Sequence, residues 1–397
     1  MRLLHTSDWH LGRNFHGASL LEDQAAAMDR IVDLSREAEV DLVVIAGDLY
    51  DRAIPPAPAV ALFTDTVARL RANGAAVVAI AGNHDSHVRV SVYDELLGAL
   101  GVSVRGDWRR AVDPVLVHPR RGGDSVAVYP LPYLEPLVDG PALLAGASEP
   151  AEAGGAAMGQ RLRHQEVMDL ALAAIRADRA RRQGTRSVLV AHAFVAGGRS
   201  CESERDLSVG NVEVVGVPSF ADFDLVALGH LHAAQELDGP RLAYAGSPLA
   251  YSFSEEGQRK GVRLLELDAS GAVTAETVPI DVGRPLRSLE GTLEQLLADS
   301  ALEEACGAWV RAVLLDDQLP AQAMARLQQR FPHAVELRHR PPRSEALSSS
   351  ARTQRIRAAT GPLERTLAFF ADQQGRAPHR EEEELLRQAL AAVRETP

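Results

Sequence analysis

The chain has 397 residues, 46% of them apolar and 24% charged, which is typical of a globular protein with two to three domains and excludes a disordered or fibrous chain. Its two cysteines, Cys201 and Cys306, form no CxxC pair, which argues against a disulfide framework or zinc finger and indicates a reducing, cytoplasmic compartment. The first residues become polar too soon for a signal peptide, so none is expected, and no apolar run is long enough to span a membrane. The net charge of −12 argues mildly against nucleic acid, although bound metal ions would add positive charge.

Alternating strands and helices predict a layered α/β fold over the first 280 residues. Several strands are almost continuously apolar, which is typical of strands covered on both faces. The predicted elements are strands at 2–7, 40–46, 75–80, 112–118, 125–131, 187–191, 224–228, 242–246 and 262–267, and helices at 20–39, 57–72, 91–100 and 162–183. Residues 140–160, rich in Ala, Gly, Glu and Pro, are expected to form a mobile surface loop.

The character of the sequence changes after Ile280. A strand at 309–315, a helix at 321–331 and a strand at 334–338 predict a small α+β module within residues 281–340. Residues 341–360 are rich in Pro, Ser and Arg and are expected to be a flexible tether. Residues 361–397 contain two amphipathic helical patterns that are separated near Gly375.

Polar side chains stand where the buried strands end. These strand-end residues are Asp8, His10, Asp48, Asn83, His84, His192, His230 and His232. Open α/β sheets place their ligands at the carboxyl ends of their strands, so we expect these side chains along one edge of one sheet system. In extended backbone, residues i and i+2 face the same side, so Asp8 and His10 can hold one ion together. His230 and His232 repeat this geometry, with two ligands on one side of an extended segment.

The set of residue types predicts a metal centre. Oxygen and nitrogen ligands without thiolate suit Mn, Fe or Zn better than the all-oxygen sites of Ca or Mg. One ion rarely takes so many ligands, whereas two ions that share a bridging carboxylate would. Paired ions about 3.5–4 Å apart are a known device for hydrolysing phosphate esters. A single one of these histidines could be structural, but the complete set indicates a binuclear site.

Five blocks of the sequence resemble the calcineurin-like metallophosphoesterases. They are Asp-x-His at 8–10, Gly-Asp-x-x-Asp at 47–51, Gly-Asn-His-Asp at 82–85, His192, and Gly-His-x-His at 229–232. The resemblance implies an α/β fold, a layered β-sandwich flanked by helices. It also implies two metal ions with Asp48 bridging them. One ion would be held by Asp8, His10, Asp48 and His232, and the other by Asp48, Asn83, His192 and His230.

The same resemblance gives His84 a role other than metal binding. It would face the substrate and stabilise or protonate the leaving oxygen, with the carboxylate of Asp51 orienting it. Some relatives carry a histidine where Asp51 stands. Arg52 either contacts a phosphate or is an ordinary surface arginine.

Further blocks resemble the SbcD family, the nuclease subunits of bacterial SbcCD complexes. These blocks are Thr6–Arg13, Ser203–Gly210, Tyr244–Pro248, Phe253–Gly257 and Lys260-Gly261. The resemblance implies a DNA nuclease using two divalent ions, with Mn²⁺ expected, that acts as an exonuclease on duplex ends and an endonuclease on single strands or hairpins. It assigns residues 281–340 to a capping, DNA-binding domain and residues 361–397 to a segment that binds the ATPase SbcC. A heterotetramer and DNA repair, replication and recombination roles follow from the same family.

Two other functions remain open on the residues alone. The ligand set would equally serve a phosphomonoesterase or a phosphoprotein phosphatase, although neither needs the appended module and helical tail. An inactive scaffold is disfavoured because the ligand set and His84 are complete. The helices at 57–72 and 91–100 are candidate faces for a dimer of nuclease subunits, the alternative being that they pack only on their own sheet.

Overall fold

The computed structural model describes residues 1–92, 94–147, 162–204, 214–342, 361–374 and 376–394. The chain divides into two compact units, each described here by itself. The first comprises residues 1–288, 303–311 and 331–336, and the second comprises 289–302, 312–330 and 337–397. Among the described residues, no helix has both the length and the apolar character needed to cross a membrane.

The first unit contains two six-stranded sheets. The first sheet has the order β14 (Val273–Pro279), β13 (Gly261–Leu267), β1 (Arg2–Thr6), β4 (Leu42–Ile45), β5 (Ala76–Ile80) and β6 (Val102–Arg105). Strands β1, β4, β5 and β6 are parallel, whereas β13 and β14 join the sheet antiparallel. Parallel neighbours need long crossover connections, which the intervening helices provide.

The second sheet has the same plan. Its order is β11 (Gln235–Asp238), β12 (Leu242–Tyr244), β10 (Leu225–Gly229), β9 (Arg186–His192), β8 (Val126–Leu131) and β7 (Val115–Val117). The four central strands are parallel, and the edge strands β7 and β11 are antiparallel to their neighbours. A small separate hairpin is formed by β2 (Asn14–Phe15) and β3 (Ala18–Ser19).

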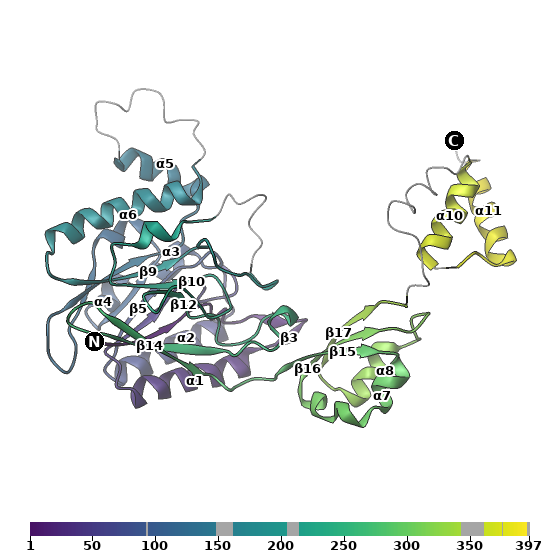
Figure 1. Ribbon diagram of the computed structural model, residues 1–397, viewed down its shortest axis with the longest axis horizontal. Helices are drawn as coiled ribbons and strands as arrows, with labels where there is room; N and C mark the ends of the chain where they lie inside the picture. The colour runs from purple at the N-terminus through teal and green to yellow at the C-terminus, as the bar shows by residue number, and fades with distance from the viewer. Residues whose placement is uncertain (93, 148–161, 205–213, 343–360, 375, 395–397) are drawn as a thin grey trace. The chain divides into compact units, whose positions relative to one another are not determined.

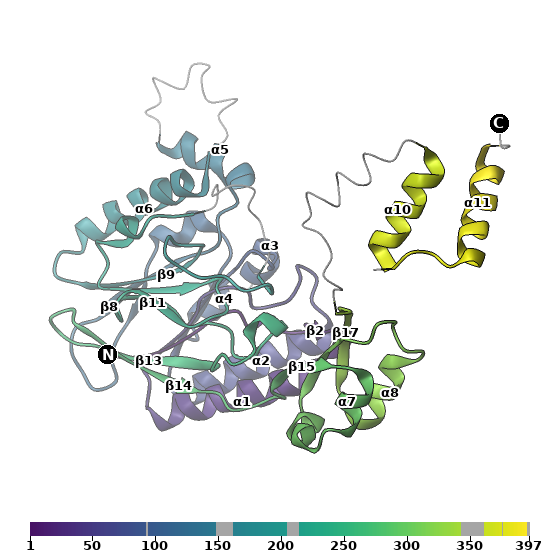
Figure 2. The same cartoon turned by 45° about the vertical axis from the view of Figure 1, so that its right-hand side comes forward.

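Helices cover the outer face of each sheet, so that the unit has four layers (Figures 1 and 2). Helices α1 (Leu21–Glu37) and α2 (Ala57–Ala72) lie on the first sheet, and α6 (His164–Arg181) lies on the second. Along β4, Leu42 and Val44 belong to the core between the sheets, whereas Val43 and Ile45 belong to the core under the helices. This period of two explains why the strands are apolar at every position.

Several boundaries differ from the sequence expectation. The predicted helix at 91–100 is divided into α3 (His87–Ser91) and α4 (Asp94–Gly98). The predicted loop at 140–160 is wrong at its start, because α5 (Pro136–Ala147) is helical there, and residues 148–161 lie outside the described part. Strands β6, β11, β14 and β15 (Leu286–Gly291) were not expected, and β11 and β14 escaped for the same reason. Both are edge strands with many exposed positions, so the apolar pattern that marks a buried strand is missing.

The remainder of the chain is α+β. A three-stranded sheet has the order β15 (Leu286–Gly291), β16 (Trp309–Leu314) and β17 (Ala334–His339). The second unit also holds α7 (Leu293–Ala298), which packs on α8 (Ala323–Arg330), and α10 (Pro362–Gln374), which packs on α11 (Arg380–Arg394). The two terminal helices occur where the amphipathic pattern predicted them.

Candidate metal centre

The strand-end residues of both sheets converge on one place. Asp8, Asp48 and Asn83 follow β1, β4 and β5 of the first sheet, whereas the three histidines come from the ends of β9 and β10 in the second sheet. The expectation of a single sheet edge is therefore corrected, because the cluster forms where the carboxyl ends of two packed sheets meet. The histidines concerned are His192, His230 and His232.

Glycines allow the strand ends to approach each other closely here, between the two sheets at Gly229 and within the first sheet at Gly82. A Cβ added to Gly229 would lie 1.7 Å from the main-chain oxygen of Ala46, which belongs to the other sheet's strand end. A Cβ added to Gly82 would lie 2.1 Å from Oδ1 of Asp48. Any larger residue at either position would push the strand ends apart, so the spacing of the cluster depends on the absence of these side chains.

The backbone is strained at the same place. Asp8, His10, Asp48 and His230 have φ angles of 53°, 43°, 48° and 110°. The extended backbone expected at Asp8, His10 and His230 is therefore wrong, although the side chains still meet. Left-handed backbone costs a residue other than glycine on the order of 1–3 kcal/mol and persists only where the surroundings enforce it. Four of the seven such residues in the described part of the chain belong to this cluster. The surrounding structure therefore holds these four residues in an unfavourable backbone conformation.

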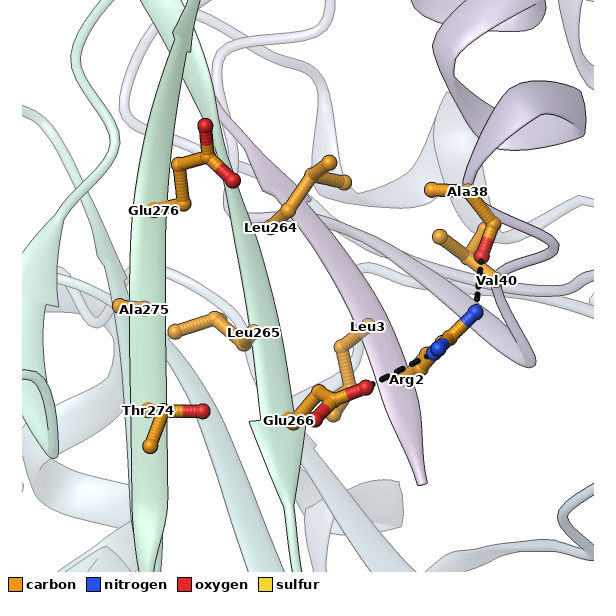
Figure 3. A pocket seen from close by; sticks show the side chains of 10 residues that line it. All are labelled: Arg2, Leu3, Ala38, Val40, Leu264, Leu265, Glu266, Thr274, Ala275 and Glu276. Atoms are coloured by element: carbon orange, nitrogen blue, oxygen red, sulfur yellow. Dashed lines mark hydrogen bonds and ion pairs between the residues drawn. The ribbon is translucent and has the colours of Figure 1, made fainter.

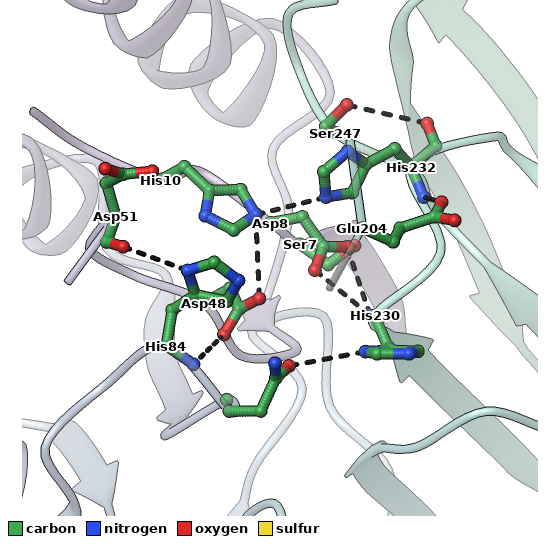
Figure 4. A network of polar contacts seen from close by, with 12 residues as sticks. Ser7, Asp8, His10, Asp48, Asp51, His84, Glu204, His230, His232 and Ser247 are labelled. Carbon is green, nitrogen blue, oxygen red and sulfur yellow. Dashed lines mark hydrogen bonds and ion pairs between the residues drawn. The ribbon is translucent and has the colours of Figure 1, made fainter. Parts of the chain in front are cut away.

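One half of the cluster is formed by Asp8, His10 and His232. Potential ligand atoms of these three buried residues all lie within 4.8 Å of one another. Nε2 of His10 lies 3.1 Å from Nε2 of His232, so the two rings direct the same nitrogen to one point (Figure 4). Oδ1 of Asp8 accepts the main-chain N–H of His230 at 3.0 Å, and Ser7 donates to Oδ2 at 2.6 Å, which fixes the carboxylate.

The other half is formed by Asn83, His192 and His230. Oδ1 of Asn83 lies 2.9 Å from Nε2 of His192 and 3.3 Å from Nδ1 of His230. The opposite nitrogen of His192, Nδ1, lies 2.9 Å from the main-chain oxygen of Ala46 and donates its proton there. This contact leaves Nε2 of His192 with a lone pair directed at the cluster.

Asp48 lies between the two halves. Its Oδ2 is 3.5 Å from Nε2 of His10 and 3.6 Å from Nε2 of His192, which belong to different halves. Its Oδ1 accepts the main-chain N–H of His84 at 2.9 Å. A single carboxylate thus faces both groups of ligand atoms, which is the position that a bridging ligand requires.

Burial sets the protonation of the cluster. Burial and the neighbouring His232 lower the pKa of His10 well below its usual value, and burial lowers that of His230 to about 3. Burial and the charge of Asp48 raise the pKa of Asp8 well above its usual value. Burial would also raise the pKa of Asp48, but the nearby His192 and His84 outweigh it and lower that pKa.

These properties fit a pair of divalent cations. The imidazoles are neutral near pH 7 and offer lone pairs, and two carboxylates share a buried space where they repel each other. Cations would relieve that repulsion and use the nitrogen lone pairs. The ligand atoms are oxygen and nitrogen without thiolate, which suits ions such as Mn²⁺, Fe²⁺ or Zn²⁺.

His84 is held at the edge of the cluster. Its Nδ1 lies 2.9 Å from the main-chain oxygen of Asp51, and its ring packs edge-on against His10 with centroids 4.7 Å apart. The expectation that the carboxylate of Asp51 orients His84 is wrong in this detail, because the main-chain carbonyl makes the contact. The Asp51 carboxylate instead lies 3.6 Å from Arg13 and 3.9 Å from Arg52, whose side chain is 59% exposed.

Asp85 supports the cluster although the sequence suggested no role for it. Its carboxylate accepts the main-chain N–H groups of Leu49 and Tyr50 at 3.0 Å and of Gly82 at 2.9 Å. It therefore ties the loop after β4 to the loop after β5. The only available signal was its place beside His84 in the motif at 82–85, and such a main-chain contact cannot be read from a sequence.

A cavity of about 350 Å³ lies elsewhere, beside β1, β13 and β14 (Figure 3). Two of its charged side chains, Arg2 and Glu266, are paired with each other. Nε of Arg2 donates to Glu266 at 2.8 Å, and Nη1 of Arg2 donates to the main-chain oxygen of Ala38 at 3.2 Å. None of the residues that line this cavity belongs to the cluster, so the chemistry is concentrated at the strand ends.

Comparisons with known proteins agree with this geometry. Residues 1–234 match the calcineurin-like phosphoesterase family, and residues 282–374 match the type 5 capsule protein repressor C-terminal domain. The SbcD subunit of nuclease SbcCD from Bacillus subtilis (strain 168) is 31% identical over 345 residues, which are 85% of this chain and 85% of that relative. The match to the solved structure of TT1561 of Thermus thermophilus covers 70% of this chain and 98% of that one at 14% identity. Its TM-score of 0.38 is too low to indicate a common fold.

The four-layer fold and the match over residues 1–234 define the class of protein, a phosphoesterase of the calcineurin-like type. The identity of 31% with the SbcCD subunit, over 85% of both chains, identifies the family within this class. The chain belongs to the calcineurin-like phosphoesterase family and, within it, to the SbcD family of nuclease subunits. Membership of this family implies divalent metal ions, which the donor set fits.

Proposed function

We propose that this chain is the metal-dependent DNA nuclease subunit of an SbcCD-type complex. The observation that carries the proposal is the position of Asp48 Oδ2, between His10 at 3.5 Å and His192 at 3.6 Å. It supports two ions with one bridging carboxylate, the arrangement that phosphodiester hydrolysis uses. The kinship with a nuclease subunit supports DNA as the substrate.

We further propose the ligands of each ion. Asp8, His10 and His232 hold one, Asn83, His192 and His230 hold the other, and Asp48 serves both. When bound, the two ions lower the pKa of a water molecule and withdraw charge from the phosphoryl oxygens. The mixture of carboxylate, amide and imidazole ligands suits Mn²⁺, Fe²⁺ or Zn²⁺, and the kinship with the SbcD family favours Mn²⁺ among them.

His84 acts on the substrate in this proposal. Its Nδ1–H donates to the main-chain oxygen of Asp51, so only Nε2 remains to transfer a proton. The ring is half-buried beside the buried cluster, which leaves it accessible to a bound phosphodiester. Protonated His84 donates from Nε2 to the leaving oxygen as general acid. Arg52, largely exposed, is retained as a residue that contacts a neighbouring phosphate.

A direct assay separates the nuclease from a phosphomonoesterase. With Mn²⁺, the purified chain is expected to cut end-labelled single-stranded DNA and hairpins, and to degrade duplex ends when SbcC and ATP are added. Hydrolysis of p-nitrophenyl phosphate should be slower by a large factor, and a chelator should stop both reactions. Rapid turnover of the monoester without any DNA cleavage would instead establish the phosphatase alternative.

We propose four functional parts of the chain. Residues 1–280 form the nuclease domain, 281–340 the capping domain that helps to hold DNA, 341–360 a tether, and 361–397 the segment that binds SbcC. The match to a second family begins at residue 282, just after β14 ends at Pro279, which supports the first boundary. Residues 343–360 of the tether lie outside the described part of the chain.

The terminal helices have the surface expected of a docking element. Among positions 362–371 and 380–390, no residue is fully buried, and Phe369 and Leu385 are 56% and 66% exposed. Two short helices with so little apolar surface covered gain stability by packing on another surface. Bidentate contacts from Arg376 to Glu382 at 2.7 Å hold the turn between them, so the pair is presented as one unit. These features support a docking role for the pair, and the kinship with a subunit of nuclease SbcCD supports SbcC as the partner.

A chain ending at Arg340 is therefore expected to bind metal and cut single-stranded DNA but to lose SbcC. It should not elute with SbcC in size-exclusion chromatography, and the mixture should show no ATP-dependent duplex degradation. In the full chain, the double substitution Phe369→Glu and Leu385→Glu should also abolish binding to SbcC. Both side chains are exposed, so each is available to contact the partner and its replacement should leave the helices folded. Gln388→Glu, on the same helix, is the matched control. Retention of the complex by the shortened chain would show that the tail is not the docking element.

A further inference from the structure

His232 is held at three of its polar atoms by residues from two distant segments. Its main-chain N–H donates to Glu204 Oε1 at 2.6 Å, and its main-chain oxygen accepts from Nζ of Lys260 at 2.8 Å. Its ring nitrogen Nδ1 lies 2.7 Å from Oγ of Ser203. The other half of the cluster differs, since Nδ1 of His192 contacts the main-chain oxygen of Ala46 and not a side chain.

The contact with Ser203 continues into a chain of hydrogen bonds. Oγ of Ser203 lies 2.6 Å from Oε1 of Glu255, and the same Oε1 accepts the main-chain N–H of Tyr251 at 2.9 Å. Lys260 donates to the other oxygen of Glu255. Glu255 is almost fully buried, at 1% exposure, so its charge is balanced by these donors and not by solvent.

The direction of the protons follows from these partners. A carboxylate with an ammonium group beside it accepts hydrogen bonds and does not donate, so the hydroxyl of Ser203 donates its proton to Glu255. Oγ of Ser203 can then only accept from Nδ1–H of His232. That assignment leaves the lone pair of His232 on Nε2, the nitrogen that lies 3.1 Å from Nε2 of His10.

Ser203 itself is anchored independently. Nη2 of Arg13 donates to the main-chain oxygen of Ser203 at 3.1 Å, and the guanidinium carbon of Arg13 lies 5.0 Å from the ring centroid of Tyr251. Because Tyr251 also donates its main-chain N–H to Glu255, both ends of the Ser203–Glu255 hydrogen bond are fixed. The hydroxyl is therefore held in place and not free to rotate to another acceptor.

We propose that Ser203, Glu255 and Lys260 are positioning residues that set the tautomer of His232 and direct its Nε2 at one of the two metal ions. The inference rests on the proposed binuclear function and adds residues to which no role was given. Partners behind metal-binding histidines commonly change metal affinity by about 10–100-fold when they are removed. The effect should fall on the ion held by Asp8, His10 and His232, and spare the other.

The test uses the full chain, freed of metal and titrated with Mn²⁺ by calorimetry and electron paramagnetic resonance. Ser203→Ala should bind one ion as the wild type does and the other about 10–100-fold more weakly, so that spin coupling between paired ions is lost at low Mn²⁺. Ser203→Thr, which keeps the hydroxyl, should restore the second ion. Ser187→Ala is the matched control, since Ser187 is also buried and donates to a carboxylate, Asp224, at 2.8 Å.

The outcome separates this inference from the proposed function. If folded Ser203→Ala binds both ions with wild-type affinity while the wild type cuts DNA, the positioning role is refuted and the nuclease stands. If the wild type binds two ions but cuts no DNA, the nuclease fails and the titration still decides the positioning role. Should Ser203→Ala not fold, Glu255→Gln replaces it, with the exposed neighbour variant Glu256→Gln as control. If Glu255→Gln binds each of the two ions as tightly as the control Glu256→Gln does, the inference is also refuted.

Discussion

Asp48→Ala is expected to abolish DNA hydrolysis and to lower the number of bound metal ions. The carboxylate of Asp48 faces both halves of the cluster, so its removal takes a ligand from each ion. No neighbouring side chain can replace it, because Asp8 is already fixed by Ser7 and by the main chain of His230. The loss should exceed that of any other single substitution in the cluster, since Oδ2 of Asp48 lies within 3.6 Å of a ligand nitrogen from each half.

The measurement combines nuclease rate with metal stoichiometry, determined on protein shown to be folded by circular dichroism. Asp41→Ala is the matched control. Asp41 is 7% exposed and lies at the other end of the same strand β4, where it accepts main-chain N–H groups of Arg2 and Arg120 at 2.8 Å. Its loss should cost stability, about 1–3 kcal/mol, without loss of metal. A folded Asp48→Ala protein with near-normal nuclease activity would contradict a bridging role.

His84→Gln should lower turnover by about 10² or more while both metal ions stay bound. Glutamine has similar bulk but cannot carry and release a proton as imidazole does, and that factor is the usual size of the loss of a general acid. The main-chain N–H at this position still donates to Asp48 Oδ1, so the substitution leaves the bridging carboxylate in place.

The metal count decides between two roles for His84. A nitrogen of His84 lies within 4.8 Å of ligand atoms of His10 and Asp48, so a ligand role is geometrically available. Loss of an ion in His84→Gln would establish that role and end the assignment as general acid. Asp51→Ala is the control, because alanine keeps the carbonyl oxygen that accepts from Nδ1 of His84. The turnover of Asp51→Ala should stay within about tenfold of the wild type. A larger loss would show that the carboxylate of Asp51, and not its carbonyl, orients the ring of His84.

The sequence by itself was sufficient to predict the α/β layering and the residues of the cluster. Apolar runs such as Val40–Ala46 form strands because backbone geometry alternates side chains between two buried faces, and this rule is local. Asp48 and Asn83 follow such strands directly, so their place at a strand end required no knowledge of tertiary contacts. The edge strands β11 and β14 escaped the same rule because solvent reaches much of their surface.

Tertiary structure decided how those residues meet. The cluster joins two sheets, and Asp8 and His230 are adjacent only because Gly229 lets the second sheet reach the main chain of Ala46. The partners of the cluster are decided at the same level. Main-chain groups such as the carbonyl of Asp51 carry no sequence signal, since every residue has one. Ser203 and Glu255 are 52 residues apart, and their hydrogen bond depends on packing that brings together segments with no local pattern in common.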